Sequence, residues 1–170
     1  MRSQQSNIIG FLADRVATTS SSRALVRGAQ DVAWQHGKQI MLFNIEHGTK
    51  SQQLAEAQLA SFRAESVIYA TRYHQPIRLA PSSIPRVLLN CFDPENAHLA
   101  IVPDDYRLAA DLMEIIFARG YKRPVFLNLP ATTVAAKLRA QGITDVARAN
   151  GMDMKDRIYT AVVELNGETS

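Results

Sequence analysis

Short apolar runs alternate along the chain with longer segments in which hydrophobic residues recur every three or four positions. The short runs are typical of strands buried on both faces, and the longer segments are typical of amphipathic helices that cover such strands. The pattern predicts a series of buried strands. They span residues 7–13, 38–44, 66–70, 86–90, 98–102, 124–128 and 157–165.

Helices are predicted between these strands from capping residues and from the spacing of apolar positions. The first follows the polar stretch 18–22 and ends at Gly37, because glycine readily adopts the left-handed conformation that stops a helix. The other three are expected to begin at Ser51, at Asp104 or Asp105, and at Thr132 or Thr133. The faces expected to turn inward are Leu25, Ala29, Val32 and Ala33 in the first helix and Leu108, Leu112, Ile115 and Ile116 in the third.

The order of these elements predicts the fold class. An amphipathic helix, a glycine, a few polar residues and a buried strand follow one another three times. This order is typical of right-handed βαβ units, so we expect an α/β fold with a mostly parallel sheet and helices on both faces. Ligands of such sheets bind at the carboxyl ends of the strands. The loops at that edge are 14–22, 45–50, 71–84, 91–97, 103–106 and 129–133.

Length and composition agree with a globular protein. The chain has 170 residues, of which 46% are hydrophobic and 21% charged. These proportions exclude the disordered, collagen-like and coiled-coil classes, and the length suits one domain or somewhat more. Cys91 is the single cysteine, so no disulfide can form within the chain and a reducing compartment is permitted.

Charge and hydropathy limit the classes of partner that the chain can bind. The net charge is +3, but the basic residues are scattered, and the densest cluster (Arg119, Lys122 and Arg123) follows a predicted helix end, where cations are favourable. No nucleic-acid-binding stripe is therefore expected. No run approaches the roughly 18–20 apolar residues of a membrane span, and the start lacks the pattern of a signal peptide. We expect a cytoplasmic protein without a membrane partner.

The sequence lacks the common motifs of catalysis. No glycine-rich turn follows the first strand, and no Gly-x-Ser-x-Gly motif occurs. His36 and His47 bracket one strand and so lie at opposite ends of the sheet, and the four histidines show no metal-ligand spacing. Cys91 has no activating neighbour and is interpreted as a packing residue. We therefore expect neither an enzyme nor a bound cofactor or metal ion.

Polar residues in the loops at the carboxyl edge form the candidate binding site. Carboxylates, amides, hydroxyls, aromatic rings and one guanidinium suit a neutral ligand with many hydroxyl groups. Asp104 or Asp105 could instead only cap a helix, 18–22 is at least partly capping, and Arg139 calls for either a ligand or a carboxylate partner. The candidates are Asp14, Thr18, Thr19, Tyr73, His74, Asn90, Asp93, Asp104, Asp105, Asn128 and Arg139.

An ordered set of short segments carries a family resemblance over nearly all of residues 7–165. These segments are Ile-Ile-Gly-Phe at 8–11, Leu-Val-Arg-Gly-Ala-Gln-Asp at 25–31, His-Gly-Lys-Gln-Ile-Met-Leu-Phe-Asn at 36–44, Val-Ile-Tyr-Ala at 67–70, Pro-Arg-Val-Leu-Leu-Asn at 85–90, Val-Pro-Asp-Asp-Tyr at 102–106, Gly-Tyr-Lys-Arg-Pro-Val-Phe-Leu-Asn at 120–128 and Arg-Ala-Gln-Gly at 139–142. In this order and spacing they resemble the effector-binding region of the lac repressor/galactose repressor family.

The resemblance implies a fold, partners and site residues. The fold would be periplasmic-binding-protein-like of type I, with two α/β lobes that close on a small effector, commonly a sugar. The family also implies a homodimer and a helix-turn-helix that reads operator DNA. By motif position, Asp104 and Arg139 match effector-contacting residues, and 14–22 matches the first ligand loop. The family's Asn-Pro-Phe-Phe is replaced here by Thr-Thr-Ser-Ser at 18–21, so hydroxyls stand where an aromatic stacking surface is usual.

The resemblance also implies a domain organisation. Residues 1–122 match one lobe, and residues 123–170 match the β-α-β start of a truncated second lobe, with no helix-turn-helix before Asn7. The expected function is a sugar-responsive transcriptional regulator that reads operator DNA through a domain absent from this chain. The alternative is a periplasmic sugar-binding protein for transport with the same fold, and an α/β enzyme is the third choice. The sugar, and whether it induces or corepresses, stays open.

Overall fold

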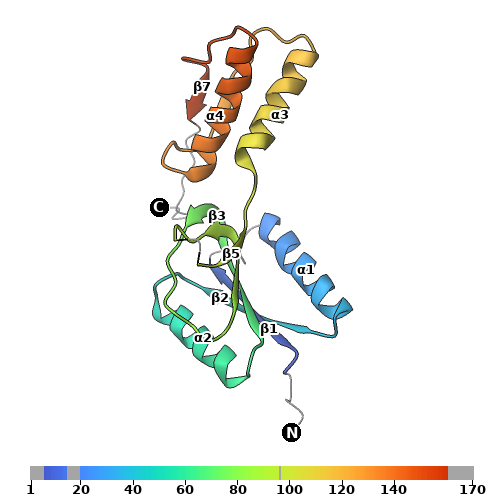
Figure 1. Ribbon diagram of the computed structural model, residues 1–170, viewed down its shortest axis with the longest axis vertical. Helices are drawn as coiled ribbons and strands as arrows, with labels where there is room; N and C mark the ends of the chain where they lie inside the picture. The colour runs from blue at the N-terminus through green and yellow to red at the C-terminus, as the bar shows by residue number, and fades with distance from the viewer. Residues whose placement is uncertain (1–5, 15–19, 96, 161–170) are drawn as a thin grey trace. The chain divides into compact units, whose positions relative to one another are not determined.

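The computed structural model describes residues 6–14, 20–95 and 97–160 (Figure 1). The chain divides into two compact units, Met1–Val102 and Pro103–Ser170. The sequence places a boundary after residue 122, whereas the structure places the division before helix α3 (Asp105–Ala118). The reason is packing, because α3 lies along helix α4 (Val134–Ala149) of the second unit.

A parallel sheet with the strand order β2-β1-β3-β4-β5 forms the framework of the first unit. Every pair of neighbouring strands in it is parallel, as the alternation of strands and helices predicts. The elements are β1 (Ile8–Asp14), α1 (Ser20–Gln35), β2 (Gln39–Ile45), α2 (Lys50–Ser61), β3 (Ser66–Pro76), β4 (Arg86–Phe92) and β5 (Leu99–Ile101).

Helices cover both faces of this sheet, which confirms the predicted layers (Figure 1). On one face, Leu59 of α2 packs with Leu12 of β1 and Tyr69 of β3. On the other face, Phe11 and its neighbours pack with Val26 and Ala29 of α1. Successive strand residues point to opposite faces, so both layers bury apolar side chains of the same strands.

The predicted inner face of α1 is half correct. Ala29 and Ala33 turn toward the sheet, but Leu25 and Val32 are 36% and 54% exposed. Val26 packs with the core in their place, one position along the helix from Leu25. A shift of one residue rotates the buried stripe by about 100°, so Leu25 and Val32 lie on a flank of the helix.

Strand β3 is longer than predicted. The apolar run ends at Ala70, but the strand continues to Pro76, with an irregular register against β4 between Ala70 and Gln75. Backbone hydrogen bonding, which needs no apolar side chain, extends the strand past this bulge. The bulge therefore places polar residues of β3 itself at the carboxyl edge of the sheet.

The second unit combines α3 and α4 with a short parallel pair, β6 (Phe126–Asn128) and β7 (Ile158–Thr160). Its core is formed by α3 and α4 with Met154, and Phe126 and Ile158 pack against it. The last strand is predicted to run to residue 165, and residues 161–165 lie outside the described part of the chain. The buried residues of this hydrophobic cluster are Ala109, Met113, Ile143, Ala147 and Met154.

The predicted inner face of α3 is wrong. Leu108, Leu112 and Ile115 are 61%, 47% and 51% exposed. The buried face contains small residues, because α4 approaches the backbone of α3 closely at Gly142. A Cβ atom on Gly142 would lie 2.4 Å from the backbone oxygen of Tyr106. Leucine and isoleucine side chains would hold the helices apart, so the stripe with alanines packs inward instead.

This close contact predicts that Gly142→Ala destabilises the second unit. The added methyl would overlap a backbone atom that cannot rotate away, so we expect the free energy of unfolding to fall by about 1–3 kcal/mol. Urea unfolding of the chain followed by circular dichroism measures the change.

Gly28→Ala is the matched control, because Gly28 is also inside a helix and a Cβ there meets nothing within 4 Å. This substitution should leave stability unchanged or raise it by up to about 1 kcal/mol, since alanine favours helices. Equal effects of the two substitutions would mean that the helices do not approach at Gly142.

Candidate functional site

The carboxyl ends of β1, β2 and β3 meet at one edge of the sheet. Asp14, the last residue of β1, lies beside Ile45 of β2 and Thr71 of β3 in the strand register. A cavity of about 330 Å³ opens at this edge. The structure thereby brings together two predicted site residues, Asp14 and Tyr73. The residues that line the cavity are Asp14, Glu46, His47, Arg72, Tyr73, Gln75, Pro76 and Ile77.

Asp14 connects two of these strand ends. Its side chain is almost buried, since the residue is only 6% exposed. The carboxylate oxygen Oδ1 accepts a hydrogen bond of 3.2 Å from the backbone N–H of His47, in the loop that follows β2. A carboxylate that accepts a backbone N–H is held in a fixed orientation, so Asp14 presents a pre-set acceptor to the cavity.

His47 makes a second contact, with the buried residue Tyr69. The imidazole Nδ1 lies 2.8 Å from the phenolic oxygen, and the two rings meet edge to face with centroids 6.0 Å apart. Burial, and then the negative charge of Asp14, raise the pKa of Tyr69 well above its ordinary value. The phenol therefore stays protonated at neutral pH and holds the His47 ring by a hydrogen bond.

The bulge in β3 is held by a network around Thr71 and Asn90. The Thr71 hydroxyl lies 2.8 Å from the backbone oxygen of Tyr73 and 3.0 Å from that of Asn90. Asn90 adopts a left-handed φ of 59°, and its amide nitrogen donates to the backbone oxygens of Thr71 and Arg72 at 3.0 Å each. Asn90, a candidate for ligand contact, therefore uses its amide nitrogen to hold the bulge of β3.

Tyr73 and Arg72 form a stacked pair in the irregular part of β3. The guanidinium carbon of Arg72 lies 5.0 Å from the centre of the Tyr73 ring, within the range of a cation–π contact. Both residues line the cavity. The pair offers an aromatic surface at the edge of the sheet, which the hydroxyl-rich segment 18–21 does not supply.

The two other loop candidates in the first unit are also buried. His74 is 9% exposed and packs edge to face on Phe92, with ring centroids 5.6 Å apart. Asp93 accepts hydrogen bonds from the backbone N–H of Glu95 and from Nδ1 of His98, at 2.9 and 3.0 Å. These contacts lower the pKa of Asp93. Neither residue lines the cavity beside Asp14.

Sequence reasoning missed several residues at this edge. His47, Tyr69 and Arg72 were not among the candidates, although His47 directly follows a predicted strand and Arg72 lies in one of the expected loops. The signal for Tyr69 is weaker, because a tyrosine inside a buried strand is typical of a core residue. Its polar role depends on the neighbouring strand, which only the sheet order reveals.

In the second unit, the two adjacent aspartates have different roles. Asp104 is exposed and caps α3, since its Oδ1 accepts the backbone N–H of Arg107 at 2.9 Å. Asp105 is completely buried, and Nε and Nη2 of Arg139 both lie 2.8 Å from its Oδ1. A cation near a helix start is expected to have a ligand or a carboxylate partner, and Asp105 is that carboxylate for Arg139. Asp105 shares the buried stripe of Ala109 and Met113, a four-residue spacing visible in the sequence.

Asn128 ties β6 to α4. Its amide nitrogen donates to the backbone oxygen of Ala136 at 2.9 Å, and its side-chain oxygen accepts the N–H of Leu129 at 2.9 Å. Thr133 caps the same helix by accepting the N–H of Ala136. Asn128 therefore orients the strand end in this unit. The predicted site residues Thr18 and Thr19 lie outside the described residues.

Cys91 lies in the core of the first unit, as expected of a packing residue. It is completely buried, and burial raises the pKa of its thiol to about 11. Over the described ranges, no three His, Cys, Asp or Glu side chains are placed to share a metal ion. In the same residues, no helix combines the length and hydropathy needed to cross a membrane.

The Asp105–Arg139 pair predicts a stability cost for Arg139→Gln. The substitution leaves a buried carboxylate without its guanidinium, which costs about 3 kcal/mol at complete burial. The Arg139 side chain is 37% exposed, so we expect a loss of about 2 kcal/mol in the free energy of unfolding. Circular dichroism during urea unfolding measures it.

Two comparisons make this test specific. Arg148→Gln removes an exposed pair with Asp145 and should cost less than about 1 kcal/mol. Adding Asp105→Asn to Arg139→Gln removes the uncompensated charge, so the double variant should lose less than the sum of the two single losses. Additive losses would show that the pair does not couple α3 to α4.

The profile of one protein family matches most of the chain. It is described as periplasmic binding proteins and sugar binding domain of the LacI family, and it matches residues 6–163. A sucrose operon repressor, found in both Shigella flexneri and Escherichia coli, is 29% identical to this chain over 160 residues. That match covers 92% of this chain and 48% of the relative, so the chain spans about half the length of the curated relatives it matches.

Solved structures show the same likeness. A protein described as a LacI-family transcriptional regulator from Rhizobium etli has a TM-score of 0.76 and 31% identity, over 91% of this chain and 56% of that one. A LacI-family regulator from Lactobacillus casei with bound sucrose has a TM-score of 0.61 and 20% identity, over 92% and 58%. The fold is that of periplasmic binding proteins of type I. With the profile matched from residue 6 to residue 163, the chain belongs to the family of periplasmic binding proteins and LacI-type sugar-binding domains.

Proposed function

We propose that this chain is part of the effector-sensing region of a sugar-responsive transcriptional regulator. The observation that carries the proposal is the 29% identity to sucrose operon repressors along 92% of the chain. These relatives are repressors, which favours regulation over the alternative, a periplasmic sugar-binding protein for transport. The chain acts by binding a small molecule and coupling this to the operator affinity of a DNA-binding domain, and it catalyses no reaction.

The cavity of the first unit supports the choice of a sugar. Each sugar hydroxyl both donates and accepts hydrogen bonds, and Asp14 supplies an oriented carboxylate acceptor. The Tyr73 ring offers an apolar face for the C–H bonds of a pyranose or furanose, and Arg72 steadies that ring. We assign effector contacts in this unit to Asp14, Tyr73, Thr18 and Thr19, the last two from the sequence alone.

The second unit is assigned its own effector contacts. They are Asp104, Asn128 and Arg139. The Arg139 guanidinium is oriented by the buried carboxylate of Asp105, and part of its side chain stays exposed. An arginine fixed in this way loses little conformational freedom when it binds a ligand oxygen. Asp104 directly precedes Asp105 in the sequence and is exposed at the start of α3.

The remaining partners follow from the same proposal. The regulator works as a cytoplasmic homodimer, it reads operator DNA through a domain outside these residues, and it needs no cofactor or metal ion. The sugar shifts the population toward one conformation by the difference between its affinities for the two. The Lactobacillus casei regulator binds sucrose in its solved structure, so sucrose is the first ligand to test.

The test uses the protein expressed from its complete gene. Sucrose, fructose and glucose are added in turn while thermal unfolding and operator binding are measured. A cognate sugar at a hundred times its dissociation constant should add about 2.7 kcal/mol to the free energy of unfolding, and it should change the operator affinity. A thermal shift without any change in operator binding would favour transport over regulation.

Asp14→Asn tests the site itself. Asparagine keeps an oxygen that can accept the N–H of His47 but removes the negative charge, so the loop should stay in place. A lost charged hydrogen bond is worth about 1.5–3 kcal/mol, so we expect sugar binding to weaken by about ten- to a hundredfold. Titration calorimetry measures the affinity. The control Asp31→Asn changes an exposed aspartate of α1, and equal affinities in the two variants would remove Asp14 from the site.

A further inference from the structure

The two ring nitrogens of His47 lie in different surroundings. Nδ1 lies 2.8 Å from the phenolic oxygen of Tyr69, a residue that is completely buried in the core. His47 itself is exposed and lines the cavity beside Asp14. The direction of Nε2 diverges from that of Nδ1, so it points away from the buried phenol. Within residues 6–14, 20–95 and 97–160, no group is bonded to Nε2.

The buried phenol of Tyr69 fixes the position of the imidazole proton. Burial, and then the charge of Asp14, raise the pKa of Tyr69, so its O–H keeps the proton. A buried O–H needs an acceptor, and in the described part of the chain the acceptor bonded to it is Nδ1 of His47. Nδ1 therefore presents its lone pair to the phenol and the ring proton is on Nε2, because the bond of one imidazole nitrogen sets the state of the other.

The backbone of His47 orients an acceptor in the same cavity. Its N–H donates to Oδ1 of Asp14 at 3.2 Å. One residue thus places a donor, its own Nε2–H, and an acceptor, the Asp14 carboxylate, at one edge of the sheet. A sugar hydroxyl both donates and accepts, and neighbouring hydroxyls repeat this pattern. Both protein groups are held in place before a ligand arrives, which lowers the conformational cost of binding.

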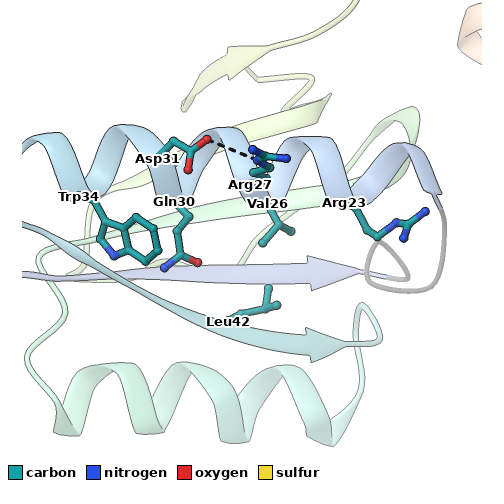
Figure 2. Close-up of a pocket in the computed structure, with 7 residues that line it drawn as sticks. All are labelled: Arg23, Val26, Arg27, Gln30, Asp31, Trp34 and Leu42. Atoms are coloured by element: carbon teal, nitrogen blue, oxygen red, sulfur yellow. Dashed lines mark ion pairs between the residues drawn. The ribbon is translucent and has the colours of Figure 1, made fainter.

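A larger hollow in the first unit, between α1 and β2, lacks such a pair of oriented groups. Its volume is about 520 Å³, and Figure 2 shows the apolar side chains of Val26 and Leu42 in it. The charged residues Arg27 and Asp31 lie 3.7 Å apart on α1, and their side chains are 84% and 54% exposed. A ligand would have to order these exposed side chains. The cavity beside Asp14 is therefore the better match for a ligand with many hydroxyl groups.

We propose that His47 contacts the effector, and that its Nε2–H donates a hydrogen bond to a hydroxyl oxygen of the sugar. A neighbouring hydroxyl of the same sugar donates to Asp14, so the two residues select a ligand with adjacent hydroxyl groups. Tyr69 is a positioning residue, because it acts on the ligand only through the ring of His47. The inference deepens the function proposed above and rests on the assignment of this cavity to the sugar.

NMR of the protein expressed from its complete gene tests the positioning by Tyr69 without a ligand. With isotope-labelled histidine, proton–nitrogen correlation spectra distinguish the two tautomers, and the His47→Asn variant assigns the signals of His47. We expect the proton on Nε2 in the unaltered protein and a mixture of tautomers in Tyr69→Phe, which keeps the buried ring but loses the hydroxyl. The control Tyr121→Phe changes an exposed tyrosine and should leave these signals unchanged. A proton on Nδ1 in the unaltered protein would overturn the proposal.

Two substitutions of His47 separate its two side-chain contacts. Asparagine places its amide near the position of Nδ1 and keeps a partner for Tyr69, but it has no atom at the position of Nε2. Glutamine reaches that position with an amide N–H. Both variants retain the backbone N–H that orients Asp14. Titration calorimetry with sucrose, fructose and glucose should show binding weakened about three- to tenfold in His47→Asn, the effect of one lost hydrogen bond, and a smaller loss in His47→Gln.

His36→Asn is the matched control, because His36 is an exposed histidine that precedes β2, whereas His47 follows the same strand. This variant should bind the sugar like the unaltered protein. Equal losses in His47→Asn and His47→Gln would overturn the donor at Nε2. Binding that is unchanged in His47→Asn but weakened in Asp14→Asn would overturn the His47 contact and keep the sugar site. If none of the three sugars binds to the unaltered protein, the proposed function and this contact both fail.

Discussion

The site of the first unit depends on one constraint, the parallel pairing of β1 with strands on both of its sides. Because β2 and β3 run in the same direction as β1, their carboxyl ends and the loops after them arrive at one edge. Residues far apart in the sequence, such as Asp14, His47 and Tyr73, then line one cavity. Asp14 is buried between these strand ends, and the backbone N–H of His47 donates the hydrogen bond that orients its carboxylate.

The second unit depends on a close approach of two helices. Gly142 allows α4 to reach the backbone of α3, and Arg139, one turn earlier, reaches the buried Asp105. The Arg-Ala-Gln-Gly segment at 139–142 thus combines steric room with a charged contact. Both features act on the same pair of helices, because residues three apart lie on neighbouring positions of a helix surface. A motif that resembles a ligand-binding signature also has a structural role.

Periodicity predicted the parallel sheet and the layers of helices correctly, because runs of buried and half-buried positions leave a strong apolar signal in β1, β3 and β4. It failed on the inward face of α3. Leu108, Leu112 and Ile115 form the more apolar stripe, but helix contact at Gly142 favours the small residues Ala109 and Ala110. The sequence shows which residues are apolar, whereas the choice between two such stripes depends on the partner helix.

The candidate site was predictable to a similar extent and for related reasons. The predicted strand ends identified Asp14 and Tyr73, since the linear sequence shows a polar residue that follows an apolar run. Tyr69 was not visible as a polar partner, because its hydrogen bond to His47 crosses from one strand to the end of another. Contacts across strands depend on the sheet order, and apolar spacing alone does not specify that order.

Strand β2 fixes one side of the cavity in the first unit. It pairs with β1 from Gln39 to Ile45, so the strand is held along its whole length. His47, just after the strand, lines the cavity and donates its backbone N–H to Asp14. The acceptor that Asp14 presents is therefore oriented by a loop that begins at a firmly paired strand end, which lowers the conformational cost of binding a ligand at this edge.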